Sequence, residues 1–196
     1  MLTLKKGIAL AAMATALALA LVACGDSGGG SASPEKTEYT NGQYGFTLTY
    51  VEPLSPVTLT PTEGEEYAIA FADKDGPTVD DLLANGLRVS VIKLDQVIKA
   101  KDVPKLEEQI AKVLEGMITD LDGGKVLGKV TATELNGTPG YAVDYQFTQG
   151  GEQLTCRLTV LIKGEYEYDL TSQAIAADWD SVTGTLEETV QTFTLD

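Results

Sequence analysis

The feature that most restricts the fold of this chain is an alternation of apolar and polar residues in its last third. Two-residue turn signals interrupt the alternation, and Asn136-Gly137 is the strongest because this pair favours a tight hairpin. Gly150-Gly151 and Gly164-Glu165 mark two more turns. The sequence therefore predicts a four-strand antiparallel meander with strands near Lys125–Leu135, Tyr141–Gln149, Gln153–Lys163 and Tyr166–Ala174.

One side of this meander is predicted to be apolar. In its third strand the apolar positions are Leu154, Cys156, Leu158, Val160 and Ile162. The intervening positions are mostly polar, so the pattern predicts one buried face and one face of mainly Thr, Gln, Asp and Glu. Four tyrosines at period two are predicted to share the buried face as core residues: Tyr141, Tyr145, Tyr166 and Tyr168.

Two amphipathic helices are predicted to cover the buried face. The first begins at Asp102, a favourable N-cap, has Pro104 in its first turn, and ends near residues 120–123. The second runs from about Asp178 to Thr192. Because strands and helices are segregated along the chain, the predicted class is α+β, with a central antiparallel sheet of about six to seven strands flanked by these two main helices.

Three earlier segments supply the other predicted strands. They alternate around Phe46–Tyr50, Tyr67–Phe71 and Arg88–Leu94. Residues 38–196 are therefore expected to form a single globular domain, which is long enough to bury a core.

The N-terminus resembles the leader of a bacterial lipoprotein. Lys5 and Lys6 precede an uncharged stretch, Gly7–Val22, which is shorter than the roughly 20 apolar residues of a membrane-spanning helix. Leu21-Val22-Ala23-Cys24 then resembles the lipobox, in which the cysteine thiol receives a diacylglyceryl group and a peptidase cuts just before it.

The leader predicts both the processing and the location of the protein. Residues 1–23 are expected to be a signal peptide, Cys24 the lipidation site, and residues 24–37 the lipidated cysteine with a flexible Gly/Ser linker. The domain is then extracytoplasmic and lipid-anchored to the outer face of the bacterial cytoplasmic membrane. The alternative is an uncleaved N-terminal membrane helix, which leaves the domain on the same side.

The composition removes several classes of function. The chain has no histidine, and therefore lacks the usual general base and the commonest metal ligand. Its net charge of −15 argues against nucleic-acid binding. If Cys24 is acylated, Cys156 is left without a disulfide partner, and its place on the apolar side of a strand predicts a buried, inert thiol. An enzyme is therefore not expected.

One loop is a candidate calcium site. Asp73, Asp75, Asp80 and Asp81 lie in a stretch that begins with Asp-x-Asp-Gly, as many calcium loops do, although the Glu that closes an EF-hand is missing. Aspartate and glycine are also ordinary turn residues, so the turn is the alternative interpretation. No cofactor is expected, and calcium at this loop is the one alternative. In the same segment, Thr78-x-x-Asp81 resembles a capping box and predicts a short helical turn over Val79–Leu83.

The domain resembles the PsbP-like family. It opens with Tyr44-Gly45-Phe46-Thr47-Leu48, an aromatic-Gly-Phe entry into a strand, and it closes with a helix that runs into Thr192-Phe193. The family usually has a proline and then a tryptophan after this strand, and here Pro53 is present but the tryptophan is not. The resemblance implies a central antiparallel sheet with helices on both faces, whereas the polar face of the meander favours a one-sided arrangement.

These observations favour a non-catalytic binding or assembly module, with the membrane as one partner through the lipid on Cys24 and a protein of the cell envelope as another. The alternative is a carrier of a lipid or other apolar ligand in a cavity between sheet and helices. A hydrolase that uses paired carboxylates is a third and weaker hypothesis, because among 29 acidic residues some pair will always look suitable.

Overall fold

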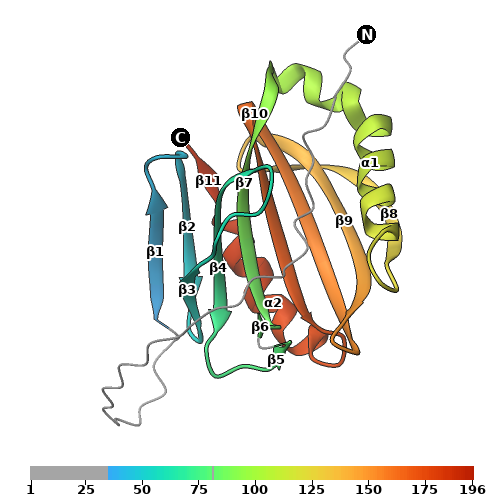
Figure 1. The fold of residues 1–196 in the computed structure, drawn as a ribbon. Helices are drawn as coiled ribbons and strands as arrows, with labels where there is room; N and C mark the ends of the chain where they lie inside the picture. Colours follow the sequence, from blue (N-terminus) through green and yellow to red (C-terminus); the bar gives the residue numbers. More distant parts are fainter. Residues whose placement is uncertain (1–34, 81) are drawn as a thin grey trace.

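The computed structural model describes residues 35–80 and 82–196, which form an α+β fold around an antiparallel main sheet (Figure 1). The strands of the main sheet lie in the order β3-β4-β7-β10-β9-β8. Their bounds are β3 Leu54–Thr58, β4 Glu65–Asp73, β7 Gly86–Ile98, β8 Lys125–Leu135, β9 Thr138–Gln149 and β10 Glu152–Ile175.

The predicted meander is confirmed, because β10 is two strands joined by a tight turn. Its first half pairs with β9 and its second half with β7, both antiparallel. The backbone N–H of Ala176 donates to the carbonyl oxygen of Gln153 at 2.8 Å, so the two ends of β10 lie side by side. Gly164, with a φ of +66°, makes the turn. The β8–β9 turn has a φ of +49° at Asn136 and +83° at Gly137, as this dipeptide predicts.

A smaller sheet stands beside the main one, in the order β1-β2-β11. It consists of β1 Lys36–Asn41, β2 Phe46–Val51 and β11 Thr194–Leu195. The strand predicted near Phe46 therefore exists but belongs to this second sheet. Strand β1 begins at Lys36, two residues before the predicted start of the domain at residue 38. Its Thr and Glu side chains are mostly exposed, so the segment carried no apolar alternation.

The two long helices lie on opposite sides of the main sheet, so the prediction that both cover one face is wrong (Figure 1). Helix α1, Glu107–Thr119, packs on β8 and β9, and α2, Trp179–Gln191, packs on β10 and β2. Val160 belongs to the apolar cluster under α1, and the next residue, Leu161, belongs to the cluster under α2. Consecutive residues of a strand point to opposite faces, so apolar residues at consecutive positions indicate a strand that is buried on both faces.

The four tyrosines are divided between the two faces, which corrects the prediction that they share one. Tyr141 and Tyr145 lie in the cluster under α1, whereas Tyr168 lies in the cluster under α2 and Tyr166 packs against it. The two-residue turn at Gly164 explains the error, because it exchanges odd and even positions between the faces. Their role as core residues is confirmed, and Tyr166 is half-buried.

Local sequence signals gave one wrong helix start and one helical turn that does not form. Residues Ala100–Leu106 form the 3₁₀-helix η1, and α1 follows it without a side-chain cap. The carboxylate of Asp102 accepts a hydrogen bond from Lys105 Nζ at 2.5 Å and caps no backbone N–H. The predicted helical turn over Val79–Leu83 is instead a hairpin of two short strands, β5 Thr78–Val79 and β6 Leu82–Leu83. Burial of Val79 against Leu154 favours this hairpin over the turn.

The aromatic-Gly-Phe motif joins the two sheets. Gly45 has a φ of +60°, which only glycine adopts without strain. This bend lets the Tyr44 carbonyl oxygen accept a hydrogen bond of 2.8 Å from the Tyr168 hydroxyl on β10. The Phe46 ring stacks on Phe193, with ring centroids 5.4 Å apart. The motif therefore fixes β2 and the C-terminal segment onto the main sheet.

Replacing Gly184 by alanine is expected to raise the free energy of unfolding by about 0.5–1 kcal/mol, because glycine costs this much within a helix. A Cβ atom at Gly184 in α2 would meet no atom within 4 Å. Denaturant unfolding measures the change. The control is Gly124→Ala, which should lower the free energy of unfolding, because its Cβ would lie 1.8 Å from the Ile118 carbonyl oxygen. A Gly184→Ala protein no more stable than wild type would contradict the expectation.

Candidate functional site

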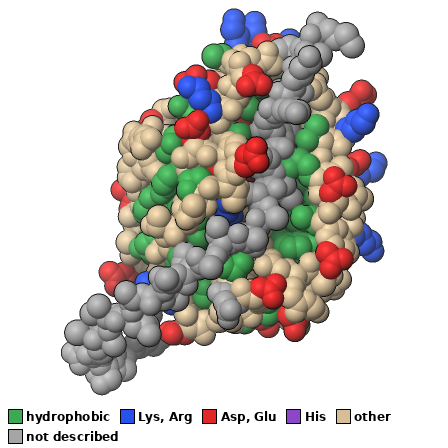
Figure 2. Space-filling view, in the orientation of Figure 1, with side chains coloured by type: hydrophobic (Ala, Val, Ile, Leu, Met, Phe, Trp, Pro, Cys, Tyr) green, Lys and Arg blue, Asp and Glu red, His purple; other side chains and the backbone are tan. Residues whose placement is uncertain are grey.

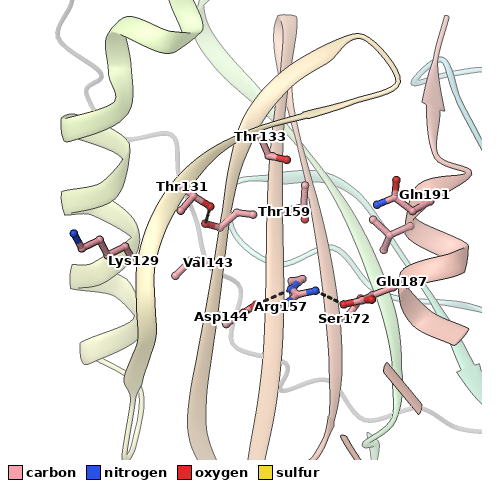
Figure 3. A pocket seen from close by; sticks show the side chains of 12 residues that line it. Lys129, Thr131, Thr133, Val143, Asp144, Arg157, Thr159, Ser172, Glu187 and Gln191 are labelled. Atoms are coloured by element: carbon pink, nitrogen blue, oxygen red, sulfur yellow. Dashed lines mark hydrogen bonds and ion pairs between the residues drawn. The ribbon is translucent and has the colours of Figure 1, made fainter. Parts of the chain in front are cut away.

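A polar groove of about 410 Å³ lies on the α2 side of the main sheet (Figure 3). Helix α2 covers only part of this face, and the polar side of β8, β9 and the first half of β10 forms the open remainder. The groove is lined by Lys129, Thr131, Thr133, Ala142, Val143, Asp144, Arg157, Thr159, Ser172, Glu187, Val190 and Gln191. Its lining is thus mainly hydroxyl, amide and charged groups.

Arg157 lies at the centre of this groove and is held by two acids. Its Nε donates to Asp144 Oδ1 at 2.7 Å, and its Nη2 donates to Asp144 Oδ2 at 3.0 Å. Its Nη1 donates to Glu187 on α2. Figure 3 shows both pairs as dashed lines across the groove. Because two carboxylates neutralise the guanidinium, the groove does not form an anion site. It presents both hydrogen-bond donors and hydrogen-bond acceptors.

The sequence predicted the polar side of the strands but not the groove. Arg157 and Thr159 were expected on the polar face of the meander, where the structure places them. The wall made by Glu187, Val190 and Gln191 was missed, since α2 was expected on the other side. No local signal in the α2 sequence reports which face of the sheet it covers.

A buried ion pair lies on the opposite face of the sheet, on β4 and β7. The Arg88 Nη2 donates to Glu65 Oε2 at 2.8 Å, and Nη1 lies 2.7 Å from Oε1. The Glu65 side chain is fully buried and that of Arg88 is 8% exposed. Burial alone would raise the pKa of Glu65, but the hydrogen bonds from Arg88 and Thr62 outweigh it and hold that pKa below its ordinary value. Arg88 also donates to Ser90 Oγ at 2.6 Å.

Two further carboxylates are buried beside this pair, on the second half of β10. Both oxygens of Glu167 and the Oδ1 atom of Asp169 are buried without a hydrogen-bond partner. Burial, followed by the charge of Asp169, raises the pKa of Glu167 well above its ordinary value. Burial raises the pKa of Asp169 to about 7, with Arg88 opposing the rise and Glu65 adding to it. Because the neighbouring Tyr166 and Tyr168 were expected on the buried face, Glu167 and Asp169 were expected on the polar face of the meander, and the structure overturns that prediction.

The stability of the protein is expected to fall as the pH rises from about 4 to about 7. Asp169 has a folded-state pKa of about 7 against an ordinary value of 3.8, so the folded state holds this proton more tightly. Its contribution is therefore complete below pH 3.8 and is lost as the pH rises through 7. Denaturant unfolding at a series of pH values measures the slope.

The variant Asp169→Asn should flatten that slope, because the amide does not titrate. Asp95→Asn, which changes an exposed aspartate on β7, is the matched control and should keep the wild-type slope. An unchanged slope in Asp169→Asn would refute the assignment.

The calcium candidates are only partly described. Asp73 Oδ1 accepts a hydrogen bond of 3.0 Å from the Asp75 backbone N–H, which is the ordinary use of aspartate in a turn. The Asp80 carboxylate lies against Gly150. Asp81 lies outside the described residues. Within residues 35–80 and 82–196, no group of three or more His, Cys, Asp and Glu side chains is arranged to hold a metal ion. Calcium binding at this loop stays a prediction.

Of the two cysteines, only Cys156 lies among the residues that the structure describes. Cys156 is fully buried, and burial raises the pKa of its thiol to about 12 despite a hydrogen bond with Tyr145. The thiol is therefore protonated and inert, as its place on the strand predicted. Cys24, the predicted lipidation site, lies outside the described residues.

Comparison with known proteins gives a fold and no closer relationship. No protein-family model and no curated protein sequence matches the chain. The cyanobacterial PsbP protein CyanoP from Synechocystis sp. PCC 6803 is similar in structure, with a TM-score of 0.56 and 14% identity over 87% of this chain and 98% of that one. LpqN, described as involved in cell envelope biogenesis of Mycobacterium tuberculosis, has a TM-score of 0.54 and 14% identity over 82% of this chain and 90% of LpqN.

A third similar structure comes from Bacteroides thetaiotaomicron VPI-5482, with a TM-score of 0.51 and 13% identity. The match covers 81% of this chain and 48% of that one. At these identities the comparisons show the fold alone. The fold is the PsbP-like α+β fold, as the sequence motif implied, with helices on both faces of an antiparallel sheet.

Proposed function

We propose that this chain is an extracytoplasmic lipoprotein, anchored through Cys24, whose domain is a non-catalytic binding module. The groove between α2 and the polar side of β8, β9 and β10 receives a polar segment of a protein partner. The single observation that carries this proposal is the groove itself, a space of about 410 Å³ lined by hydroxyl, amide and charged groups. Such a lining suits a polypeptide, which offers both donors and acceptors.

Two further observations support the location. The leader resembles that of bacterial lipoproteins, and LpqN, which shares the fold, is described as involved in cell envelope biogenesis. The described residues contain no helix long and apolar enough to span a membrane. A lipid on Cys24 is the anchor that we propose.

The described residues favour a binding module over a carrier of apolar ligands. A carrier requires an apolar cavity. The spaces under α1 and under α2 hold the chain's own apolar side chains, such as Ile110 and Leu114 under α1 and Leu186 under α2. The groove on the sheet is mainly polar.

The anchor is tested by metabolic labelling with an alkyne analogue of palmitate, followed by fractionation of the cells. The wild-type chain is expected to carry the label and to sediment with membranes, and Cys24→Ser should lose both properties. Cys156→Ser is the matched control, because it removes the other cysteine and should keep both. Labelling that survives in Cys24→Ser would refute the anchor.

The groove is tested by photo-crosslinking in intact cells. A benzoylphenylalanine at Thr131, in the groove, should crosslink to one recurrent protein. The same residue at the exposed Glu108 on α1, across the sheet, should not. A second variant, Gln191→Trp, fills the groove and should abolish the crosslink while the protein still reaches the membrane. Equal crosslinking from both positions, or none from Thr131, would overturn the proposal for the groove and leave the anchor to its own test.

A further inference from the structure

The carboxylates Glu167 and Asp169 lie on the face of the main sheet opposite the groove. Within the sheet, Asp169 is paired with Ser90 and Glu167 with Ile92 on β7, so their side chains share a face with Arg88 and Ser90. Helix α1 packs on β8 and β9, away from β4 and β7, so this polar cluster lies beside the helix instead of beneath it. The site is therefore independent of the groove in position and in residues.

The charges in this cluster do not balance. Arg88 Nη2 donates to Glu65 Oε2 at 2.8 Å, and Nη1, which donates to Ser90 Oγ, forms an ion pair with Glu65 Oε1 at 2.7 Å. Asp169 faces the same guanidinium but receives no hydrogen bond from it, and Arg88 Nε is itself buried without an acceptor. Glu167 interacts with Asp169. This cluster thus contains three carboxylates and one buried cation, which is paired with Glu65. The other groups that face Asp169 are Tyr145 on β9 and Glu167 on its own strand, and neither is a cation.

Glu167 is the group that points to a ligand. Its side chain is completely buried, and neither carboxylate oxygen has a partner. An unpaired buried carboxyl is costly in either protonation state, and native proteins almost always satisfy such groups. A donor that fits between Glu167 and Asp169 would satisfy three orphaned oxygens at once, the two of Glu167 and Oδ1 of Asp169.

We propose that Glu167 and Asp169 form a binding site for an organic cation, an alkylammonium or guanidinium group. Residues two apart on a strand are about 6.6 Å apart at their backbones, from the rise of ~3.3 Å per residue. An ammonium or guanidinium has several N–H donors and bridges two such carboxylates through bonds of about 2.8 Å. A calcium ion needs six to eight oxygens within about 2.6 Å. The described residues offer no set of three carboxylates arranged for a metal.

Isothermal titration of the detergent-purified full chain at pH 8 tests the site, with agmatine as the probe because it carries both cationic groups. We expect saturable binding with one site per chain. Glu167→Gln/Asp169→Asn should weaken that binding at least tenfold. These changes preserve side-chain size and remove buried charge, so the variant should keep its fold, and its denaturant midpoint checks this.

The control for general attraction to an acidic surface is Asp95→Asn/Glu108→Gln. This variant removes the same number of charges from exposed positions and should bind agmatine as wild type does. Figure 2 shows why the control matters, because acidic side chains are scattered over the visible face of the molecule. Equal weakening in both double variants, or no saturable binding at millimolar agmatine, would overturn the site.

Two further arms identify the source and nature of the cation. The tripeptide Gly-Arg-Gly, binding more tightly than agmatine, would assign the cation to the side chain of a protein, and the reverse order would assign it to a small molecule. Both results support an organic-cation site. Calcium binding that depends on Glu167 and displaces agmatine would contradict the organic-cation site and indicate a metal site.

Discussion

Replacing Arg88 by methionine is expected to lower the free energy of unfolding at pH 7 by about 3–5 kcal/mol, because it leaves Glu65 buried without its partner. The Glu65 side chain is fully buried, and the guanidinium donates a hydrogen bond to Oε2 and lies 2.7 Å from Oε1. Methionine fills much of the same volume, so the loss reports the missing charge more than a cavity. Urea unfolding followed by circular dichroism measures the change.

The matched control is Arg157→Met, which removes an arginine from a second bidentate pair. The Arg157 side chain is 41% exposed and its partner Asp144 is 38% exposed, so water replaces the lost contacts. That variant should cost about 1 kcal/mol or less. The double variant Arg88→Met/Glu65→Gln should recover part of the loss, since it removes the orphaned charge. If Arg157→Met is as damaging as Arg88→Met, burial is not what makes the Arg88 pair important.

Replacing Phe46 by alanine is expected to lower the free energy of unfolding by about 3–5 kcal/mol, the usual cost of removing a buried phenylalanine ring. The Phe46 side chain is completely buried, and its ring centroid lies 5.4 Å from that of Phe193 and 6.0 Å from that of Tyr39. The ring centroid of Phe46 also lies 6.1 Å from that of Tyr67 on β4, and this contact joins the small sheet to the main one. The amides of β1 and β2 should therefore lose hydrogen-exchange protection before those of β7 and β10.

Phe46→Leu is the graded control and should cost less than the alanine variant, because it keeps most of the apolar volume. Val97→Ala provides the baseline, since Val97 is 68% exposed and its side chain should contribute almost nothing. An alanine variant at Phe46 that unfolds like wild type would mean that the small sheet docks on the main sheet without the ring.

The strands of the meander were predictable because the turns between them carry local signals. The four-strand meander followed from turns such as Asn136-Gly137, where the backbone conformation is set by two residues alone. Alternation could not predict that both faces of the sheet are covered. After the two-residue turn at Gly164, even-numbered residues such as Tyr166 and Tyr168 point to the opposite face from the even-numbered residues before it. The resemblance carried by the Tyr44-Gly45-Phe46 segment implied helices on both faces, and it was the better guide.

The candidate sites were less predictable than the fold. Arg157 and Thr159 could be placed on a polar face, but the groove exists only because α2 stands beside them. Glu65, Arg88 and Glu167 lie on three strands far apart in the sequence, and each looks like an ordinary solvated residue in its own alternation. A usable signal did exist, since a sheet with both faces covered must bury the polar residues of its middle strands.

The small sheet also has a consequence for how this chain folds. Strand β2 has β1 on one side and β11 on the other, and the Thr49 N–H donates to Thr192 Oγ1 at 2.7 Å across 143 positions of sequence. Closing so long a loop costs chain entropy before any contact is gained, and antiparallel folds rich in such contacts reach the native state in milliseconds to seconds. Folding of this domain therefore cannot be completed until Thr192 and β11 are available to pair with β2.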